Sequence, residues 1–190
     1  MSRRIHVTDD NSVKMNGMIS SVLGQLSDGM WENSTRMTGY WAWAEYDHET
    51  NDIVIDSRDN YYTADYKNPY SRMSDEGVKK FFANKIKQLV RENLKNDYEY
   101  KIKTDIYAKY GLKYGSMIIV PLYDENYYER VDAAHKESRE YLKANPFNLK
   151  GKFNGDNDTE LSYLHGYDER YNRIPVTVKE AYRAYRVLCA

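Results

Sequence analysis

Residues 74–95 read SDEGVKKFFANKIKQLVRENLK and form the clearest helical pattern in the sequence. Ser74 suits the N-cap position, and two acidic residues follow it where the helix dipole favours negative charge. The spacing predicts a helix over residues 75–94, because apolar side chains recur along one stripe. That stripe consists of Val78, Phe81, Phe82, Ile86, Leu89, Val90 and Leu94. A second face collects basic side chains, at Lys80, Lys87, Arg91 and Lys95.

The sequence before this helix predicts a short strand or loose arm, a helix and a hairpin. Residues 1–11 are polar and form the arm, and apolar residues at helical spacing over 12–26 predict the first helix. Residues 36–46 alternate loosely in polarity, and 52–56 follow after a polar turn, which is typical of a β-hairpin. Residues 56–73 show no periodicity, so we expect a long loop there.

The sequence after this helix predicts two strands, two helices and a second loop. Residues 98–103 alternate tyrosine and isoleucine with charged residues, which favours a strand, and 115–122 predict a buried strand. A long helix is expected over 125–144, and 146–175 are rich in Gly, Asn and Asp, as in a loop. The last helix opens with the TVKE sequence of residues 177–180, which is a capping box.

The order of these elements predicts the fold class. Strands and helices do not alternate as βαβ units, so we expect an α+β fold in which three to four helices pack on a small mixed or antiparallel sheet. A chain of 190 residues fits a single domain over 1–190. The arm at 1–11 and the loops at 56–73 and 146–175 are its expected irregular parts.

Charge and composition narrow the range of functions. The chain has 28 basic and 29 acidic residues, so only a local patch, and not the net charge, would attract nucleic acid or an anionic membrane. No apolar run approaches the ~20 residues of a membrane helix, and the N-terminus lacks the apolar stretch of a secretory signal. The single cysteine, Cys189, forms no internal disulfide, as in proteins of reducing compartments. We therefore expect a cytoplasmic protein.

The charges and the tyrosines are distributed unevenly. Acidic residues dominate 45–76 and basic residues dominate 79–113, which favours either two neighbouring segments that neutralise each other or two separate binding surfaces. There are 20 tyrosines against 4 phenylalanines. Tyrosine is enriched at protein interfaces because it combines a rigid ring with a polar tip, and coding bias in an AT-rich genome is the alternative explanation.

Motifs for catalysis and for metal binding are scarce. The four histidines are scattered, and the sequence has neither the glycine-rich loop of nucleotide-binding enzymes nor the elbow of serine hydrolases. We therefore expect no catalytic activity, no cofactor and no resident metal. Residues 156–160 gather oxygen ligands of the kind calcium prefers, but they lack the glycine and the terminal Glu of an EF-hand loop, so a solvated acidic turn is the favoured interpretation. Glu99 and Lys101, on the predicted strand, match half of a metal-dependent nuclease site, with Asp56 as the candidate partner carboxylate.

One stretch carries a resemblance. Residues 26–34, LSDGMWENS, followed by MTGYW at 37–41, resemble small proteins of phages and mobile elements of low-GC bacteria. The chain length, the Tyr, Asn and Lys content and the scarcity of enzyme motifs are similar to those of anti-CRISPR proteins. That resemblance implies a compact inhibitor that binds a Cas effector in a bacterial host and blocks the binding or cleavage of target DNA. Anti-CRISPR proteins share no common fold or motif, so the resemblance assigns no residue.

The leading hypothesis is therefore a phage-type binding protein, without catalytic activity, that inhibits a host defence nuclease. Its partner is a Cas nuclease or the complex of that nuclease with nucleic acid. Acidic side chains compete for the basic grooves of nucleases, and aromatic side chains supply strong contacts. The expected protein-binding residues are Trp31, Trp41, Trp43, Asp56, Asp59, Tyr61, Tyr62, Asp65 and Tyr66.

Two further hypotheses remain open. The first is a nucleic-acid-binding accessory protein that contacts phosphates through its basic helix. Its expected contacts are Lys80, Lys87, Arg91, Lys95 and Lys101. The second is a metal-dependent nuclease built on Glu99 and Lys101.

Overall fold

The structure is a computed structural model that describes residues 2–23, 44–56, 70, 72–115, 124–167 and 172–190. The chain divides into two compact units. The first consists of Met1–Arg91 and Gly151–Ala190, and the second of Glu92–Lys150. The fold is α+β, as predicted from the order of the elements, with two small antiparallel sheets where one sheet was expected.

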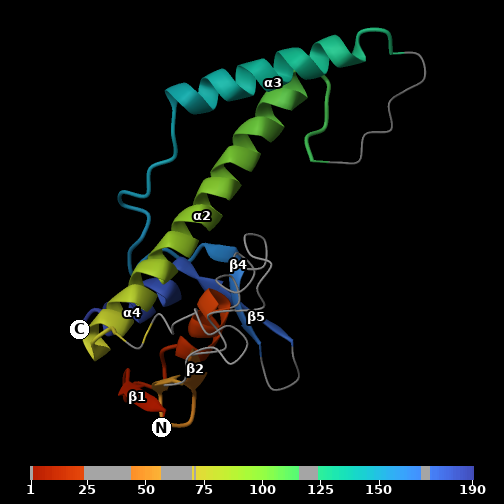
Figure 1. Ribbon diagram of the computed structural model, residues 1–190. Helices are drawn as coiled ribbons and strands as arrows, with labels where there is room; N and C mark the ends of the chain where they lie inside the picture. Colours follow the sequence, from red (N-terminus) through yellow and green to blue (C-terminus); the bar gives the residue numbers. More distant parts are fainter. Residues whose placement is uncertain (1, 24–43, 57–69, 71, 116–123, 168–171) are drawn as a thin grey trace, which may run out of the picture. The chain divides into compact units, whose positions relative to one another are not determined.

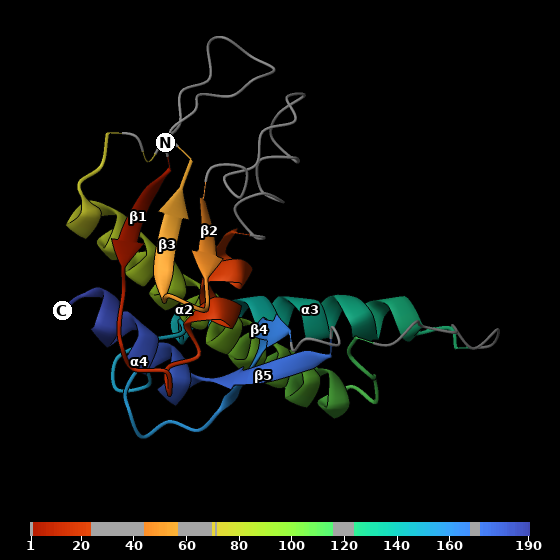
Figure 2. The same cartoon turned by 90° about the horizontal axis from the view of Figure 1, so that it is seen from below.

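The first unit contains a three-stranded antiparallel sheet in the order β1-β3-β2 (Figure 2). These strands are β1 (Arg3–His6), β2 (Ala44–Asp47) and β3 (Asp52–Ile55). Ile5 on β1 and Tyr46 on β2 both lie opposite Ile53 in the register. Because side chains alternate between the faces of a strand, one face buries isoleucines while the other carries charged residues.

The sheet confirms the predicted hairpin over its described part. β2 and β3 pair across a turn that ends at Asn51, whose φ of 55° lies in the left-handed region that asparagine tolerates. Residues 36–43 of the predicted hairpin lie outside the described residues. The predicted arm over 1–11 contributes β1, which adds to the free edge of β3.

The long helix α2 (Asp75–Lys109) begins where the sequence predicts it and extends 15 residues beyond the predicted end at residue 94 (Figure 1). The predicted strand at 98–103 is wrong, because these residues continue α2. Two ion pairs at i,i+4 spacing fit this outcome, Lys95 with Glu99 and Lys101 with Asp105. Extending an existing helix adds a hydrogen bond for each residue fixed, whereas a new strand needs a partner.

The remaining elements of the first unit are a helix at residues 15–23, a second sheet and a last helix. The second sheet pairs β4 (Glu160–Tyr167) with β5 (Arg173–Thr177) in antiparallel orientation, so the predicted loop over 146–175 is wrong at these residues. Helix α4 (Val178–Leu188) has the predicted capping box, in which the Thr177 side chain and backbone bond to Glu180. Cys189 follows α4 and is exposed.

The core of the first unit confirms the predicted apolar stripe of α2. Val78, Phe82 and Ile86 are fully buried, and so are Met18 and Ile19 on the first helix. Tyr70 is also buried, and its ring stacks on Phe82 at 6.1 Å between centroids. The apolar face of each element therefore points into one shared core.

The second unit consists of the C-terminal part of α2 and of α3 (Tyr127–Ala144), which the sequence predicted over 125–144. The Tyr98 hydroxyl donates to the carbonyl of Asn145 at 2.9 Å, and Lys109 Nζ lies 2.8 Å from Glu137 Oε1. These two contacts join the C-terminal part of α2 to α3, one just after the end of α3 and one within it. The predicted strand over 115–122 lies outside the described residues, apart from Gly115.

Within the described part of the chain, no helix has both the length and the apolar composition that crossing a membrane requires.

Candidate functional site

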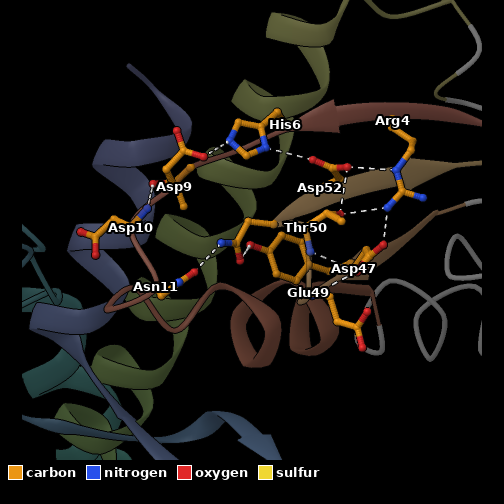
Figure 3. Close-up of polar contacts among 12 residues, drawn as sticks. Arg4, His6, Asp9, Asp10, Asn11, Asp47, Glu49, Thr50 and Asp52 are labelled. Atoms are coloured by element: carbon orange, nitrogen blue, oxygen red, sulfur yellow. Dashed lines mark hydrogen bonds and ion pairs between the residues drawn. The ribbon is translucent and has the colours of Figure 1, made fainter.

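Among the described residues, an extensive polar arrangement lies on the charged face of the first sheet (Figure 3). We call it the hairpin charge cluster and define it as Arg4, His6, Asp47, Thr50 and Asp52. The strand register explains why these residues meet, since Asp52 on β3 pairs with His6 on β1 and with Asp47 on β2. Arg4 lies two residues before His6 and therefore on the same face.

Arg4 bridges the two strands of the hairpin. Its Nε donates to Asp52 Oδ2 at 2.9 Å and its Nη2 donates to Thr50 Oγ1 at 2.9 Å and to Asp47. These hydrogen bonds lower the pKa of both carboxyl groups and raise the pKa of the guanidinium. The Asp52 side chain is only 14% exposed, so Arg4 compensates for much of its reduced hydration.

His6 lies between two carboxylates. Its Nδ1 is 3.0 Å from Asp52 Oδ1, and its Nε2 is 3.0 Å from Asp9 Oδ1. The hydrogen bond to Asp52 is the main cause of a raised pKa for His6, and the bond to Asp9 adds to it. The imidazole therefore retains its proton to a higher pH than a free histidine does.

A hollow of about 400 Å³ lies beside the hairpin turn between β2 and β3, the turn that also contains Thr50 of the cluster. Its walls come from residues 11–17, from the turn and from β5. The Tyr46 hydroxyl donates to Asn51 Oδ1 at 3.0 Å, and Asn51 Nδ2 donates to Asn11 Oδ1 at 2.9 Å. Burial raises the pKa of Tyr46 to about 12, so its hydroxyl stays protonated at neutral pH and donates a hydrogen bond. Lys14, in the same wall, forms an ion pair of 2.6 Å with Glu180.

The chemistry of these groups suits binding. The cluster's carboxylates are occupied by Arg4, Thr50 and His6, and the wall of the hollow offers hydroxyl and amide groups. Among the described residues, no group of three or more His, Cys, Asp or Glu side chains has the arrangement of a metal site. The hydroxyl and amide groups of the wall already bond to one another, so a small polar group would use their remaining hydrogen-bonding capacity.

The expected protein-binding residues fall mostly outside the described part of the chain. Asp56 is described, half-buried, and follows β3 directly. The others lie outside the described residues, namely Trp31, Trp41, Trp43, Asp59, Tyr61, Tyr62, Asp65 and Tyr66. The hypothesis that they form a binding surface stays a prediction.

The expected nucleic-acid contacts all lie on α2 and are exposed. Lys95 and Lys101 form ion pairs with Glu99 at 3.6 Å and Asp105 at 2.9 Å. Lys87 lies 5.6 Å from the centre of the Tyr185 ring. Lys87 follows Lys80 by seven residues and Arg91 follows Lys87 by four. These three side chains therefore share one helix face within the first unit.

The two weaker metal-binding interpretations change in the structure. Glu99 and Lys101 are helical, so they do not occupy a strand as the nuclease pattern requires, and Glu99 pairs with Lys95. Within residues 156–160, the Asn157 side chain accepts a hydrogen bond from the Thr159 amide, and Asp158 forms an ion pair with Lys179. In both sets, the structure therefore shows local helix or turn contacts of these side chains.

Sequence reasoning missed the hairpin charge cluster, although two signals for it were present. Arg4 and His6 have the period-2 spacing of one strand face, and Asp47 and Asp52 flank the polar turn at equal distance from its centre. What the sequence does not provide is the pairing of β1 with β3, which connects residues almost fifty positions apart.

Comparison of the chain with protein-family models, with curated proteins and with solved structures found no match.

Proposed function

We propose that this protein is a binding protein without catalytic activity, of the phage-encoded type, that inhibits a host defence nuclease in the bacterial cytoplasm. The observation that supports it best is the exposure of three large aromatic side chains on the helices of the second unit. Tyr100, Tyr128 and Tyr141 are 54%, 69% and 43% exposed.

Exposed tyrosines favour protein binding for an energetic reason. Each ring offers a large contact area with few rotatable bonds, and burying it against a partner removes apolar surface from water. Residues of this type dominate the measured binding energy of interfaces. Tyr128 and Tyr141 both lie on α3.

The acidic residues enter the proposal in a restricted way. Asp47 and Asp52 share the guanidinium of Arg4 within the hairpin charge cluster, so their charge is partly compensated inside the protein. For competition with a basic nuclease groove, the proposal keeps the acidic residues expected from the sequence, Asp56, Asp59 and Asp65. Asp56 follows the last residue of β3.

A phage-challenge assay tests the proposal. The chain is expressed in bacteria whose Cas effector targets an infecting phage, and plaques are counted for several effector types. We expect the chain to raise the plaque count by orders of magnitude for at least one type, and the purified chain to copurify with that effector. The double variant Tyr128→Ala/Tyr141→Ala should reduce both effects.

The matched control is Tyr98→Phe, which removes one hydroxyl from the same unit and leaves the exposed rings intact. Absence of protection against every effector, together with absence of complexes with the purified effectors, would contradict the proposal. So would full inhibition by the double variant, because the exposed rings would then have no role in binding.

A second candidate function is nucleic-acid binding by the basic face of α2. It is favoured by Lys80, Lys87 and Arg91, which are exposed on one helix face and have no carboxylate partner within 4.0 Å among the described residues. Such a surface contacts phosphates without reading sequence.

A salt titration of duplex DNA binding tests this candidate. Neutralising three phosphates predicts a slope of log affinity against log salt of about −2.7 for a duplex. The triple variant Lys80→Gln/Lys87→Gln/Arg91→Gln should remove the binding. Lack of duplex binding by the unaltered chain at low salt would exclude it.

A further inference from the structure

A second hollow, of about 240 Å³, lies within the second unit. Helix α2 contributes Lys103 and Tyr107 to its wall, and α3 contributes His135 and Arg139. Each pair is four residues apart, so both members of a pair lie on one face of their helix. Tyr114, in the segment that follows α2, completes the wall. We call this the tyrosine–basic hollow.

The wall of the tyrosine–basic hollow is basic without an acidic counterpart. Lys103, His135 and Arg139 line it, and the described residues of its lining include no carboxylate. Other basic residues of the same unit bind acids directly, as Lys109 binds Glu137 and Arg130 binds Asp124. Among the described residues, neither Lys103 nor Arg139 has a carboxylate within the 4.0 Å of an ion pair, so their charges are available to an anionic ligand.

Tyrosine rings form the other part of the wall. The Tyr114 ring centre lies 5.0 Å from that of Tyr107 and 5.5 Å from that of Tyr100. Lys103 Nζ is 5.7 Å from the Tyr114 ring centre, so a cation and an aromatic face lie side by side. Tyr100 is 54% exposed and extends the aromatic surface beyond the hollow into solvent.

Gly115 holds part of this aromatic surface in place. Its φ of 79° lies in the left-handed region, and a Cβ at this position would lie 3.0 Å from Cε2 of Tyr100. Only a residue without a side chain allows the chain to pass so close to the Tyr100 ring. The backbone between α2 and α3 therefore passes directly against the Tyr100 ring.

We propose that the tyrosine–basic hollow binds a nucleotide of a single-stranded nucleic acid. A base stacks on the tyrosine rings, and the adjoining phosphate binds Lys103 and Arg139. Alternating aromatic and basic side chains are how proteins bind single strands, because every base has a face that stacks and every phosphate is anionic. A duplex is a poor ligand, since its bases are already stacked within the helix and do not reach the rings.

This site is distinct from the basic face of α2 and does not depend on the proposed inhibition of a nuclease. Its expected contacts are Tyr100, Lys103, Tyr107, Tyr114, His135 and Arg139.

Fluorescence anisotropy with the full chain tests the site. The probes are a labelled oligothymidylate of about 15 nucleotides and a duplex of equal length, both at low salt. We expect the single strand to bind more tightly than the duplex. The double variant Lys103→Gln/Arg139→Gln should weaken binding about tenfold or more and flatten the salt dependence by about 0.7 for each phosphate that the variant no longer neutralises. Tyr114→Leu should weaken binding about five- to hundredfold, because a leucine side chain cannot stack on a base.

Lys136→Gln is the matched control, because this exposed lysine lies on α3 outside the lining of the hollow. It should bind the single strand within about twofold of the unaltered chain. Circular dichroism of each variant confirms that the helices are intact. Equal affinity for duplex and single strand would overturn the proposal. So would unchanged binding by the double variant, or an oligoglutamate peptide that binds as tightly as the single strand.

Discussion

The imidazole of His6 illustrates how a single residue couples this fold to pH. In the folded chain it bonds to Asp52 and Asp9, whereas unfolding separates the imidazole from both carboxylates. Its pKa is therefore higher in the folded state than in the unfolded state. A group of this kind stabilises the fold fully below its unfolded pKa, near 6.5, and the contribution disappears as pH rises through the folded pKa.

The first prediction concerns this pH dependence. The free energy of unfolding of the unaltered chain should exceed that of His6→Gln at pH 5.5, and the difference should shrink as the pH rises above about 6.5. Urea denaturation across that range measures it. His48→Gln, in the turn of the same hairpin, is the control, because His48 has no comparable pair of carboxylates among the described residues. A difference that grows with rising pH would contradict the assignment.

The Tyr127 hydroxyl gives a second prediction at this scale. The side chain is buried and its hydroxyl has no hydrogen-bond partner among the described residues. Because a buried unsatisfied hydroxyl is destabilising, Tyr127→Phe should raise the free energy of unfolding by about 1 kcal/mol. Tyr110→Phe should act in the opposite direction, since the Tyr110 hydroxyl donates to Glu137 at 2.6 Å. Urea denaturation compares the two variants, and a decrease in the stability of Tyr127→Phe would be inconsistent with this view.

At the scale of elements, the start of α4 depends on two reciprocal hydrogen bonds. The Glu180 amide donates to Thr177 Oγ1 at 3.3 Å, and the Thr177 amide donates to Glu180 Oε2 at 2.9 Å. Partial burial raises the pKa of Glu180, but the bonds from Lys14 and Thr177 outweigh it, so the net pKa is lowered. The carboxylate is therefore ionised at neutral pH and serves both α4 and the ion pair with Lys14.

The third prediction separates these two roles. Thr177→Ala should lower the free energy of unfolding by about 1 kcal/mol, because it leaves the Glu180 amide without its cap. Glu180→Gln retains an oxygen that accepts from the Thr177 amide, so it should cost less and remove mainly the Lys14 ion pair. Thermal unfolding of both variants measures the difference. If Glu180→Gln lowered the stability more than Thr177→Ala, the ion pair with Lys14 would contribute more to stability than the capping box does.

The elements that could be predicted from sequence are those with a strong local signal. The apolar stripe and N-cap located the start of α2, and the TVKE sequence located α4. The strand predicted at 98–103 failed because tyrosine and isoleucine alternate there by chance while the charged residues follow the helical period. The strands β4 and β5 were missed because Gly and Asn in the region resemble loop residues.

The candidate sites were harder to predict than the elements. The hairpin charge cluster needs β1 beside β3, and the tyrosine–basic hollow needs α3 against α2. In both cases the residues concerned are distant in sequence and carry no shared local pattern. Lys101 was chosen from the sequence for its charge, yet it pairs with Asp105, whereas Lys103 lines a hollow.

At the scale of the whole molecule, each unit has buried residues of its own on α2. Ile86 is fully buried within the first unit, and Ile106 is 4% exposed within the second. Groups of residues with their own buried contacts open as cooperative units in native-state exchange. The sequence suggested one domain over 1–190, which stays a prediction.

The fourth prediction follows from these two cores. Ile106→Ala should lower stability by about 2–5 kcal/mol and speed amide exchange mainly in peptides from Glu92–Lys150. Ile86→Ala should instead speed exchange in the strands β1, β2 and β3. Hydrogen–deuterium exchange followed by mass spectrometry measures both patterns. Uniform acceleration along the whole chain in either variant would show that the two units unfold together.

The close approach of Gly115 to Tyr100 couples the evolution of two positions that are fifteen residues apart. Any side chain at 115 meets the tyrosine ring and a backbone conformation that disfavours it. Loss of the ring at 100 would remove one of these two obstacles and leave the left-handed backbone, so an aromatic residue at 100 will tend to coexist with glycine at 115. Sequences descended from a common ancestor should show the two positions changing in concert.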